Sequence, residues 1–177
     1  MKKLIAVISL LFVLAACSRD DGNISNFNPD PKAGGPATDF LYRDIREVPF
    51  RLSEKKGNVV ILYFWRMKCE ECKEELDSLE ALNKKYKDNG LIIAAVNADS
   101  MHSAPLGEVL EFIEKHGLTF VNMRDDKGFV TEAYNVLKAP QSFIIDKNGT
   151  IHTVGKKSLE WMSPENTLMI EGLIKAP

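Results

Sequence analysis

Two cysteines, Cys69 and Cys72, lie three residues apart in the segment YFWRMKCEECKEEL (63–76), where an apolar run gives way to a charged one. A Cys-x-x-Cys pair at the start of a helix is suited to thiol–disulfide exchange, because the unpaired N–H groups and the dipole of the helix N-terminus favour the thiolate. The thiolate attacks a disulfide, and the second cysteine, one turn later, resolves the mixed disulfide. We therefore expect Cys69 to be the nucleophile and Cys72 the resolving thiol.

Three other uses of this cysteine pair compete with redox chemistry. A structural zinc site needs four ligands, and His102, His116 and His152 are scattered singly, so they supply no second ligand pair. A purely structural disulfide across one helical turn closes a very short loop and stabilises little. A pair of inert buried thiols is the third alternative, but the charged flank KCEECKEE favours an exposed position. We expect redox chemistry, with no metal.

The elements around the pair can be predicted from the pattern of apolar residues. The run NVVILYFW (58–65) is continuous, apolar and β-rich, as in a central strand covered on both faces. Apolar residues then recur at helical spacing until Asn89-Gly90. Further segments follow: a strand at 91–98, a helix at 105–117, a short strand and a short helix, a hairpin at 141–155 and a final helix from 163. A short hairpin is expected at 38–54, and the whole order predicts an α/β fold with a mixed central sheet flanked by helices.

Composition and length are those of one ordinary globular domain. The chain has 177 residues, 45% of them hydrophobic and 27% charged, with a formal net charge of −2. This balance gives no indication of nucleic-acid binding. Cys17, Cys69 and Cys72 are the only cysteines, too few for a small domain held together by disulfides.

The N-terminal segment has the features of a secretory signal. Residues 1–16 combine a positive start with a short apolar run and end in small residues directly before Cys17. The sequence LAAC resembles the bacterial lipobox, which implies that Cys17 is lipidated; ordinary cleavage, leaving a free thiol at Cys17, is the alternative. Residues 17–36 then form the lipidated cysteine and a flexible polar tether, and residues 37–177 form the domain. The expected location is the extracytoplasmic side of the bacterial cell envelope, with the membrane bound through the lipid.

The segment VVILYFWRMKCEECKEELDSLEAL (59–82) resembles the active-site region of thioredoxin-like proteins, and most of all the membrane-tethered ResA/TlpA group. The resemblance runs from about residue 37 to the C-terminus. It implies a thioredoxin-like fold with an N-terminal hairpin and an extra αβ insertion. It also implies an envelope thiol–disulfide oxidoreductase that reduces disulfides in extracytoplasmic proteins, apocytochrome c among them. A membrane electron donor would restore the dithiol, and no cofactor is needed.

The resemblance assigns roles to four further residues. Pro140, in KAPQSFIID, matches the family's cis-proline, and with Ala139 it would hold the substrate backbone beside the cysteines; an ordinary trans turn is the alternative. Glu75 matches a glutamate that accepts or relays a proton as a buried Cys72 ionises, whereas a solvated helix side chain is the alternative. Trp65 matches the tryptophan of the family's FW pair; it is expected to pack against the active-site loop and to be a substrate-binding residue together with Ala139 and Pro140.

The sequence also departs from the thioredoxin pattern near the pair. Thioredoxins carry a buried Asp six residues before the first cysteine, where this chain has Tyr63. Lys68 stands in place of the usual aromatic residue and favours the thiolate of Cys69, whereas Glu70 and Glu71 disfavour it. The two glutamates could select partners with basic surfaces, or they are ordinary exposed charges at a helix start.

Two other functions are compatible with this fold. A peroxiredoxin-like thiol peroxidase is expected to have a Thr-x-x-Cys site with a nearby arginine, but RMKCEEC has no threonine and only Arg66. A redox-inactive, thioredoxin-fold binding lipoprotein would carry its cysteines as vestiges.

Overall fold

A five-stranded mixed sheet forms the centre of the computed structural model, which describes residues 22–177. In spatial order its strands are β6 (Val121–Arg124), β5 (Leu91–Asn97), β4 (Val59–Trp65), β7 (Gln141–Ile145) and β8 (Ile151–Gly155). β4, β5 and β6 run parallel to one another. β7 pairs antiparallel with β4, and β8 pairs antiparallel with β7. The helices are α1 (Glu70–Tyr86), α2 (Leu106–Lys115), α3 (Phe129–Ala133) and α4 (Pro164–Lys175), with short 3-10 turns η1 (Leu52–Lys55) and η2 (Lys87–Asn89). The predicted α/β class, the mixed sheet and the helix and strand between β5 and α3 are confirmed.

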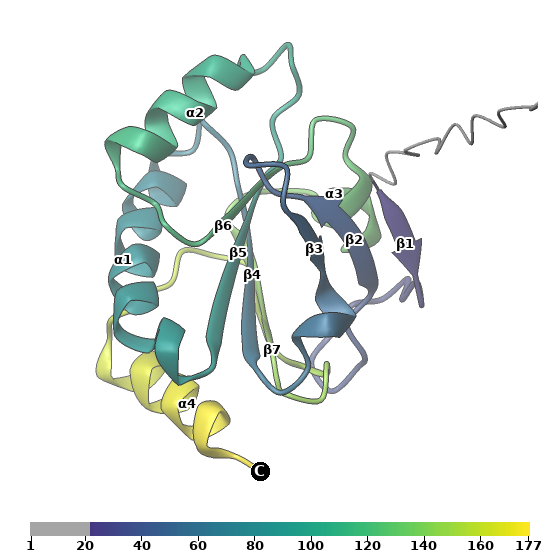
Figure 1. Cartoon of the computed structure of the whole chain (residues 1–177), viewed down its shortest axis with the longest axis vertical. Helices are drawn as coiled ribbons and strands as arrows, with labels where there is room; N and C mark the ends of the chain where they lie inside the picture. Colours follow the sequence, from purple (N-terminus) through teal and green to yellow (C-terminus); the bar gives the residue numbers. More distant parts are fainter. Residues whose placement is uncertain (1–21) are drawn as a thin grey trace, which may run out of the picture.

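The central strand β4 is buried on both faces, as its uninterrupted apolar sequence predicts. Side chains alternate across a strand, so its residues divide between two hydrophobic cores. Odd-numbered residues from 59 to 65 pack with α1 and Trp161, and even-numbered residues from 60 to 64 pack with Phe40, Tyr134 and Phe143. Helices α1, α2 and α4 cover the first face and α3 lies on the second (Figure 1). The start of α1 is therefore fixed against a rigid sheet.

The N-terminal part of the described chain forms a second, antiparallel sheet. The predicted hairpin is present as β2 (Asp39–Arg43) and β3 (Pro49–Arg51), and β1 (Asn23–Ser25) adds a third strand. The flexible tether predicted for residues 17–36 is therefore partly wrong. β1 pairs with β2, and the Gly34 N–H donates a hydrogen bond to the Ile151 carbonyl at 2.8 Å. These contacts are mostly backbone hydrogen bonds, with Ile24 as the apolar side chain of β1 that packs on the second core, so the polar composition did not reveal them. Cys17 and the predicted signal segment lie outside the described residues.

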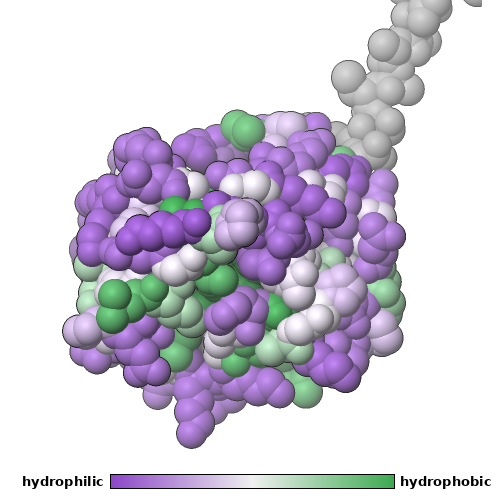
Figure 2. Space-filling model, turned by 90° about the horizontal axis from the view of Figure 1, so that it is seen from below, coloured by the Kyte–Doolittle hydropathy of each residue, from purple (hydrophilic) through white to green (hydrophobic). Residues whose placement is uncertain are grey.

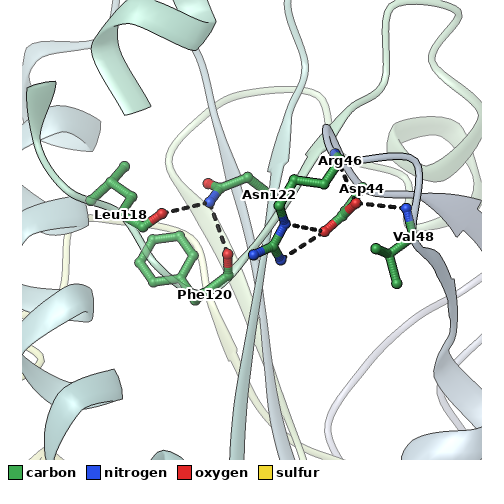
Figure 3. A network of polar contacts seen from close by, with 6 residues as sticks. All are labelled: Asp44, Arg46, Val48, Leu118, Phe120 and Asn122. Carbon is green, nitrogen blue, oxygen red and sulfur yellow. Dashed lines mark hydrogen bonds and ion pairs between the residues drawn. The ribbon is translucent and has the colours of Figure 1, made fainter. Parts of the chain in front are cut away.

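The turn between β2 and β3 is held by a carboxylate (Figure 3). The buried Asp44 accepts hydrogen bonds from the Val48 N–H at 2.9 Å and from the Arg46 guanidinium at 2.7 and 2.9 Å. Beside it, the Asn122 side-chain amide donates to two backbone carbonyls at 2.9 and 3.2 Å. An isolated bridge between Asp44 and Met123 then joins this turn to β6. The small sheet is thereby attached to the edge of the large one.

The cysteine pair lies at the end of the sheet where α1 starts. Within residues 22–177, the opposite end of the sheet carries no cysteine. Seen from that end, apolar atoms gather in a hollow between hydrophilic ones (Figure 2). A cavity of about 400 Å³ at the start of β4 is walled by Leu52, Val60 and Ile145 together with polar loop residues. No helix within residues 22–177 has both the length and the apolar character needed to cross a bilayer.

Candidate active site

The cysteine pair lies at the junction of β4 and α1, as predicted. Cys69 is the N-cap of α1, and its Sγ accepts a hydrogen bond from the Cys72 N–H at 3.2 Å. The two residues form a disulfide with their Cα atoms 5.2 Å apart. Cys72 is fully buried, whereas Cys69 is only partly buried. An incoming protein can therefore reach Cys69 first, in keeping with its expected role as the nucleophile.

The loop between β4 and Cys69 is anchored to the end of β5. Asp99 is 2% exposed, and its Oδ2 accepts the Met67 N–H at 2.7 Å and the Asn97 amide at 3.0 Å. Its Oδ1 accepts the Ser103 hydroxyl at 3.0 Å. Met67 lies two residues before Cys69, so Asp99 fixes the approach of the chain to the nucleophile.

We expect replacement of Asp99 by alanine to loosen this loop. The partly buried Met67 N–H loses its acceptor, which costs about 1–3 kcal/mol of the free energy of unfolding. Disulfide exchange should also slow, because Cys69 is no longer held against the sheet. Urea denaturation and stopped-flow exchange measure the two effects. Replacement of the exposed Asp126 by alanine is the control, and an equal loss in both variants would contradict the role of Asp99.

A buried carboxylate lies directly behind the cysteine pair. Glu75 is 3% exposed, and its Oε2 accepts the indole N–H of Trp161 at 2.7 Å. Its Oε1 is also buried and has no partner of good hydrogen-bond geometry among residues 22–177. Burial raises the pKa of Glu75, although the nearby polar groups of Ser158, Trp161 and Leu159 oppose the shift. The structure therefore buries Glu75, where the alternative expectation was a solvated helix side chain.

Tyr63 connects the carboxylate to the resolving cysteine. Its hydroxyl donates to the Cys72 carbonyl at 3.4 Å, and its ring meets that of Trp161 edge to face. Burial, and after it the charge of Glu75, raise the pKa of Tyr63, so the hydroxyl stays protonated. Tyr63 occupies the position where thioredoxins carry an aspartate, and here a carboxylate reaches the same region from α1 instead. The site thus has one acid group behind Cys72.

Pro140 lies beside the pair, at the start of β7. The Ala139–Pro140 peptide bond is cis, as predicted. Ala139 and Cys69 pack against the same hydrophobic cluster. A cavity of about 420 Å³ is lined by both Ala139 and Pro140 and by Glu71, which stands between the two cysteines. This cavity is a groove beside Pro140 that extends to the residue between the two cysteines.

Trp65 supports the site from the side of α2. It is fully buried, and its ring packs against Phe112 with ring centres 5.4 Å apart. Phe112 in turn stacks on His116, whose Nδ1 lies 2.8 Å from the Asp77 carboxylate on α1. Trp65 therefore joins β4 to α2. Because its side chain is fully buried, the expected packing role fits better than direct substrate contact.

Sequence reasoning did not single out Trp161 or Asp99. Trp161 is in a loop 86 residues from Glu75, and no local pattern links the two. Asp99 lies two residues after the end of the buried strand β5, a position where polar side chains meet at one edge of a sheet, and this signal could have identified it. Within the described range, no group of histidine, cysteine and acidic residues has the arrangement of a metal site.

Comparison with known proteins agrees with this geometry. The model of the AhpC/TSA family matches residues 33–154. The chain belongs to the AhpC/TSA family. A thiol–disulfide oxidoreductase ResA from Geobacillus kaustophilus is 37% identical over 121 residues, which cover 68% of this chain and 67% of that protein. A thiol–disulfide oxidoreductase ResA from Oceanobacillus iheyensis is 30% identical over 160 residues, which cover 88% of this chain and 78% of that protein.

The same likeness extends to solved structures. A crystal structure of a DsbE-type thiol:disulfide interchange protein from Chlorobium tepidum superimposes with a TM-score of 0.71. The two chains are 27% identical, and the match covers 82% of this chain and 99% of the other. Within the AhpC/TSA family this protein is thus a thioredoxin-fold thiol–disulfide oxidoreductase of the ResA and DsbE type, and the predicted resemblance is confirmed.

Proposed function

We propose that this protein is a lipid-anchored reductant of the bacterial cell envelope that reduces disulfides in extracytoplasmic proteins, including apocytochrome c before haem attachment. The observation that carries the proposal is the buried carboxylate of Glu75 behind the fully buried Cys72. A dithiol that reduces its substrate must lose the Cys72 proton during the reaction. A nearby acid group with a raised pKa is suited to take that proton.

The reduction proceeds in two exchange steps. The Cys69 thiolate attacks one sulfur of the substrate disulfide, a mixed disulfide forms and the first substrate thiolate leaves. Cys72 then loses its proton to Glu75, and its sulfur attacks Cys69 Sγ. The mixed disulfide breaks, the second substrate thiolate leaves, and the Cys69–Cys72 disulfide of the structure is formed. Two electrons pass from the dithiol to the substrate, and a membrane electron donor must return them.

Glu75 also has a route for returning its proton to solvent. A second cavity, of about 500 Å³, is lined by Glu75, Ser158 and Leu159 together with exposed side chains of α1. Water in this cavity would accept the proton after each turnover. This cavity adjoins the groove beside Pro140 through Ser158, which lines both.

The location rests on separate observations. The sequence before Cys17 has the pattern of a lipoprotein signal, and the curated relatives are named ResA. Gly22, the first described residue, donates a backbone hydrogen bond to the Leu41 carbonyl, so a lipid at Cys17 would hold the domain close to the membrane surface.

The equilibrium redox potential of the Cys69–Cys72 couple, titrated against dithiothreitol, tests the direction of the reaction. A value near that of thioredoxin, about −270 mV, or below it is expected for a reductant. A value near that of DsbA, about −120 mV, would mean that the protein forms disulfides and would contradict the proposal. The reduced protein should also reduce an oxidised Cys-x-x-Cys-His peptide faster than it consumes hydrogen peroxide. The reverse order would favour a peroxidase.

A further inference from the structure

The groove beside Pro140 is unusually basic for a chain with a net charge of −2. Its wall contains Lys138, Lys156 and Lys157, against a single acidic residue, Glu71. All three lysines are exposed. None of the ion pairs found among residues 22–177 involves any of them. Three cations without carboxylate partners therefore surround the place where a substrate backbone would lie.

The β7–β8 hairpin brings these lysines together from separate parts of the chain. Ser142 near the start of β7 pairs with Gly155 at the end of β8. Lys138, just before the cis peptide bond, and the Lys156–Lys157 pair, just after β8, consequently project at the same end of the hairpin. That end carries the cysteines, because Glu71 and Pro140 line the same groove. The positive charge thus follows from strand register and lines the groove that extends to Glu71, between the two cysteines.

The acidic residues at the start of α1 do not cancel this charge. Glu70 is already paired with Lys73 on its own helix at 2.9 Å. Glu74 and Glu160 line the other cavity, which adjoins the groove through Ser158 but does not include the three lysines. Only Glu71 faces the groove. The expectation that the glutamates between the cysteines select basic partners therefore does not fit this side of the site, where positive charge predominates.

We infer that the groove selects substrates whose target cysteine is flanked by acidic residues, an inference that rests on the proposed reductase function. The occupant is an extended polypeptide segment lying along Ala139–Pro140, with Asp or Glu side chains directed to Lys138, Lys156 and Lys157. An extended chain advances about 3.3 Å per residue, so carboxylates within about two residues of the cysteine are in reach. Complementary charge of this kind raises the association rate and selects between partners more than it tightens binding.

Three peptides test the inference. They share one sequence with a single cysteine joined by a disulfide to 2-nitro-5-thiobenzoate, and the residues on both sides of the cysteine are Asp, Ser or Lys. The reduced protein, in excess over the peptide, releases the coloured thiol in a single turnover, which gives the second-order rate constant for each peptide. We expect the acidic peptide to react about tenfold faster than the neutral one, and the basic peptide more slowly than both. Raising the salt concentration to about 1 M, where the Debye length is about 3 Å, should remove most of the difference.

A charge-matched pair of variants isolates the groove. The variant with Lys138→Gln, Lys156→Gln and Lys157→Gln should react with the acidic and neutral peptides at rates within about twofold of each other. The control variant, with Lys87→Gln, Lys115→Gln and Lys127→Gln, changes three exposed lysines elsewhere and should keep the full preference. The control variant should keep the wild-type rate with each peptide. Thiol titration of both reduced variants should give the same number of free thiols as the wild-type protein, which shows that the dithiol is intact.

Other outcomes overturn the inference in distinguishable ways. Equal rates for the acidic and neutral peptides in the wild-type protein, or equal loss of preference in both variants, reject the selective groove and leave the reductase function in place. Failure of the wild-type protein to reduce any of the three peptides rejects the proposed function, and this inference with it.

Discussion

Replacement of Cys72 by serine should convert the protein into a stable covalent trap for its substrates. Cys69 is the partly exposed N-cap thiol and still attacks the substrate disulfide, but the fully buried resolving thiol is missing. The mixed disulfide then persists until an external thiol reaches it. Catalytic turnover should fall to background, while one equivalent of the first substrate thiolate is still released.

Non-reducing electrophoresis and mass spectrometry of cell extracts measure the trapped species. Replacement of Cys69 by serine is the matched control: it also abolishes turnover, but it should trap nothing, because the remaining thiol is buried. Trapping by the Cys69→Ser variant instead would reverse the assignment of nucleophile and resolving thiol. Absence of trapping in both variants would support a binding protein without redox activity.

Replacement of Glu75 by glutamine should slow the resolving step by about 100-fold near neutral pH. A positioned general base contributes about 10²–10⁴ in rate, and glutamine keeps the size and the acceptor for the Trp161 N–H but cannot take a proton. Single-turnover kinetics with a mixed disulfide at Cys69 isolate this step. The rate of the variant should recover as the pH rises, because Cys72 can then ionise to solvent. A pH profile identical to that of the wild-type protein would exclude Glu75 as the base.

The same substitution should change the pH dependence of stability. Because burial raises the pKa of Glu75 above its ordinary value of 4.5, the folded protein retains a proton that the unfolded chain loses. The contribution of Glu75 to the free energy of unfolding is therefore highest below about pH 4.5. It falls as the pH rises to the folded-state pKa, by about 1.4 kcal/mol for each unit of the shift. Denaturant titrations of the oxidised protein from pH 4 to 9 should show this decline, and the Glu75→Gln variant should lack it.

Trp161 offers a separate check on this carboxylate. Replacement of Trp161 by phenylalanine retains an aromatic ring against Tyr63 and removes the indole N–H that stabilises the charged form of Glu75. The pKa of Glu75 should rise further, and the pH profile of the resolving step should move to higher pH. Replacement of the buried Trp65, whose packing partner is Phe112, by phenylalanine should leave the profile in place.

Local sequence determined the chemistry of this protein. The seven apolar residues of β4 predict a strand buried on both faces, and the change to helical spacing at Cys69 places the pair at a helix N-terminus. The buried strand and the helix start both depend on neighbouring residues alone, so the local sequence is sufficient to predict them. The resemblance in the same segment was sufficient to predict the fold, the cis-proline and the glutamate that follows the pair.

Tertiary structure decided what surrounds the cysteines. Trp161 meets Glu75 across 86 residues, and β7–β8 register brings Lys138 to Lys156 and Lys157. Likewise, β1 joins the domain through backbone pairing that its polar composition does not indicate. Contacts between distant segments depend on which faces and edges the whole fold leaves available, and no local period encodes them. The sequence alone therefore located the cysteine pair, and the folded chain determined that Glu75 is buried against Trp161 and that three lysines line the groove beside Pro140.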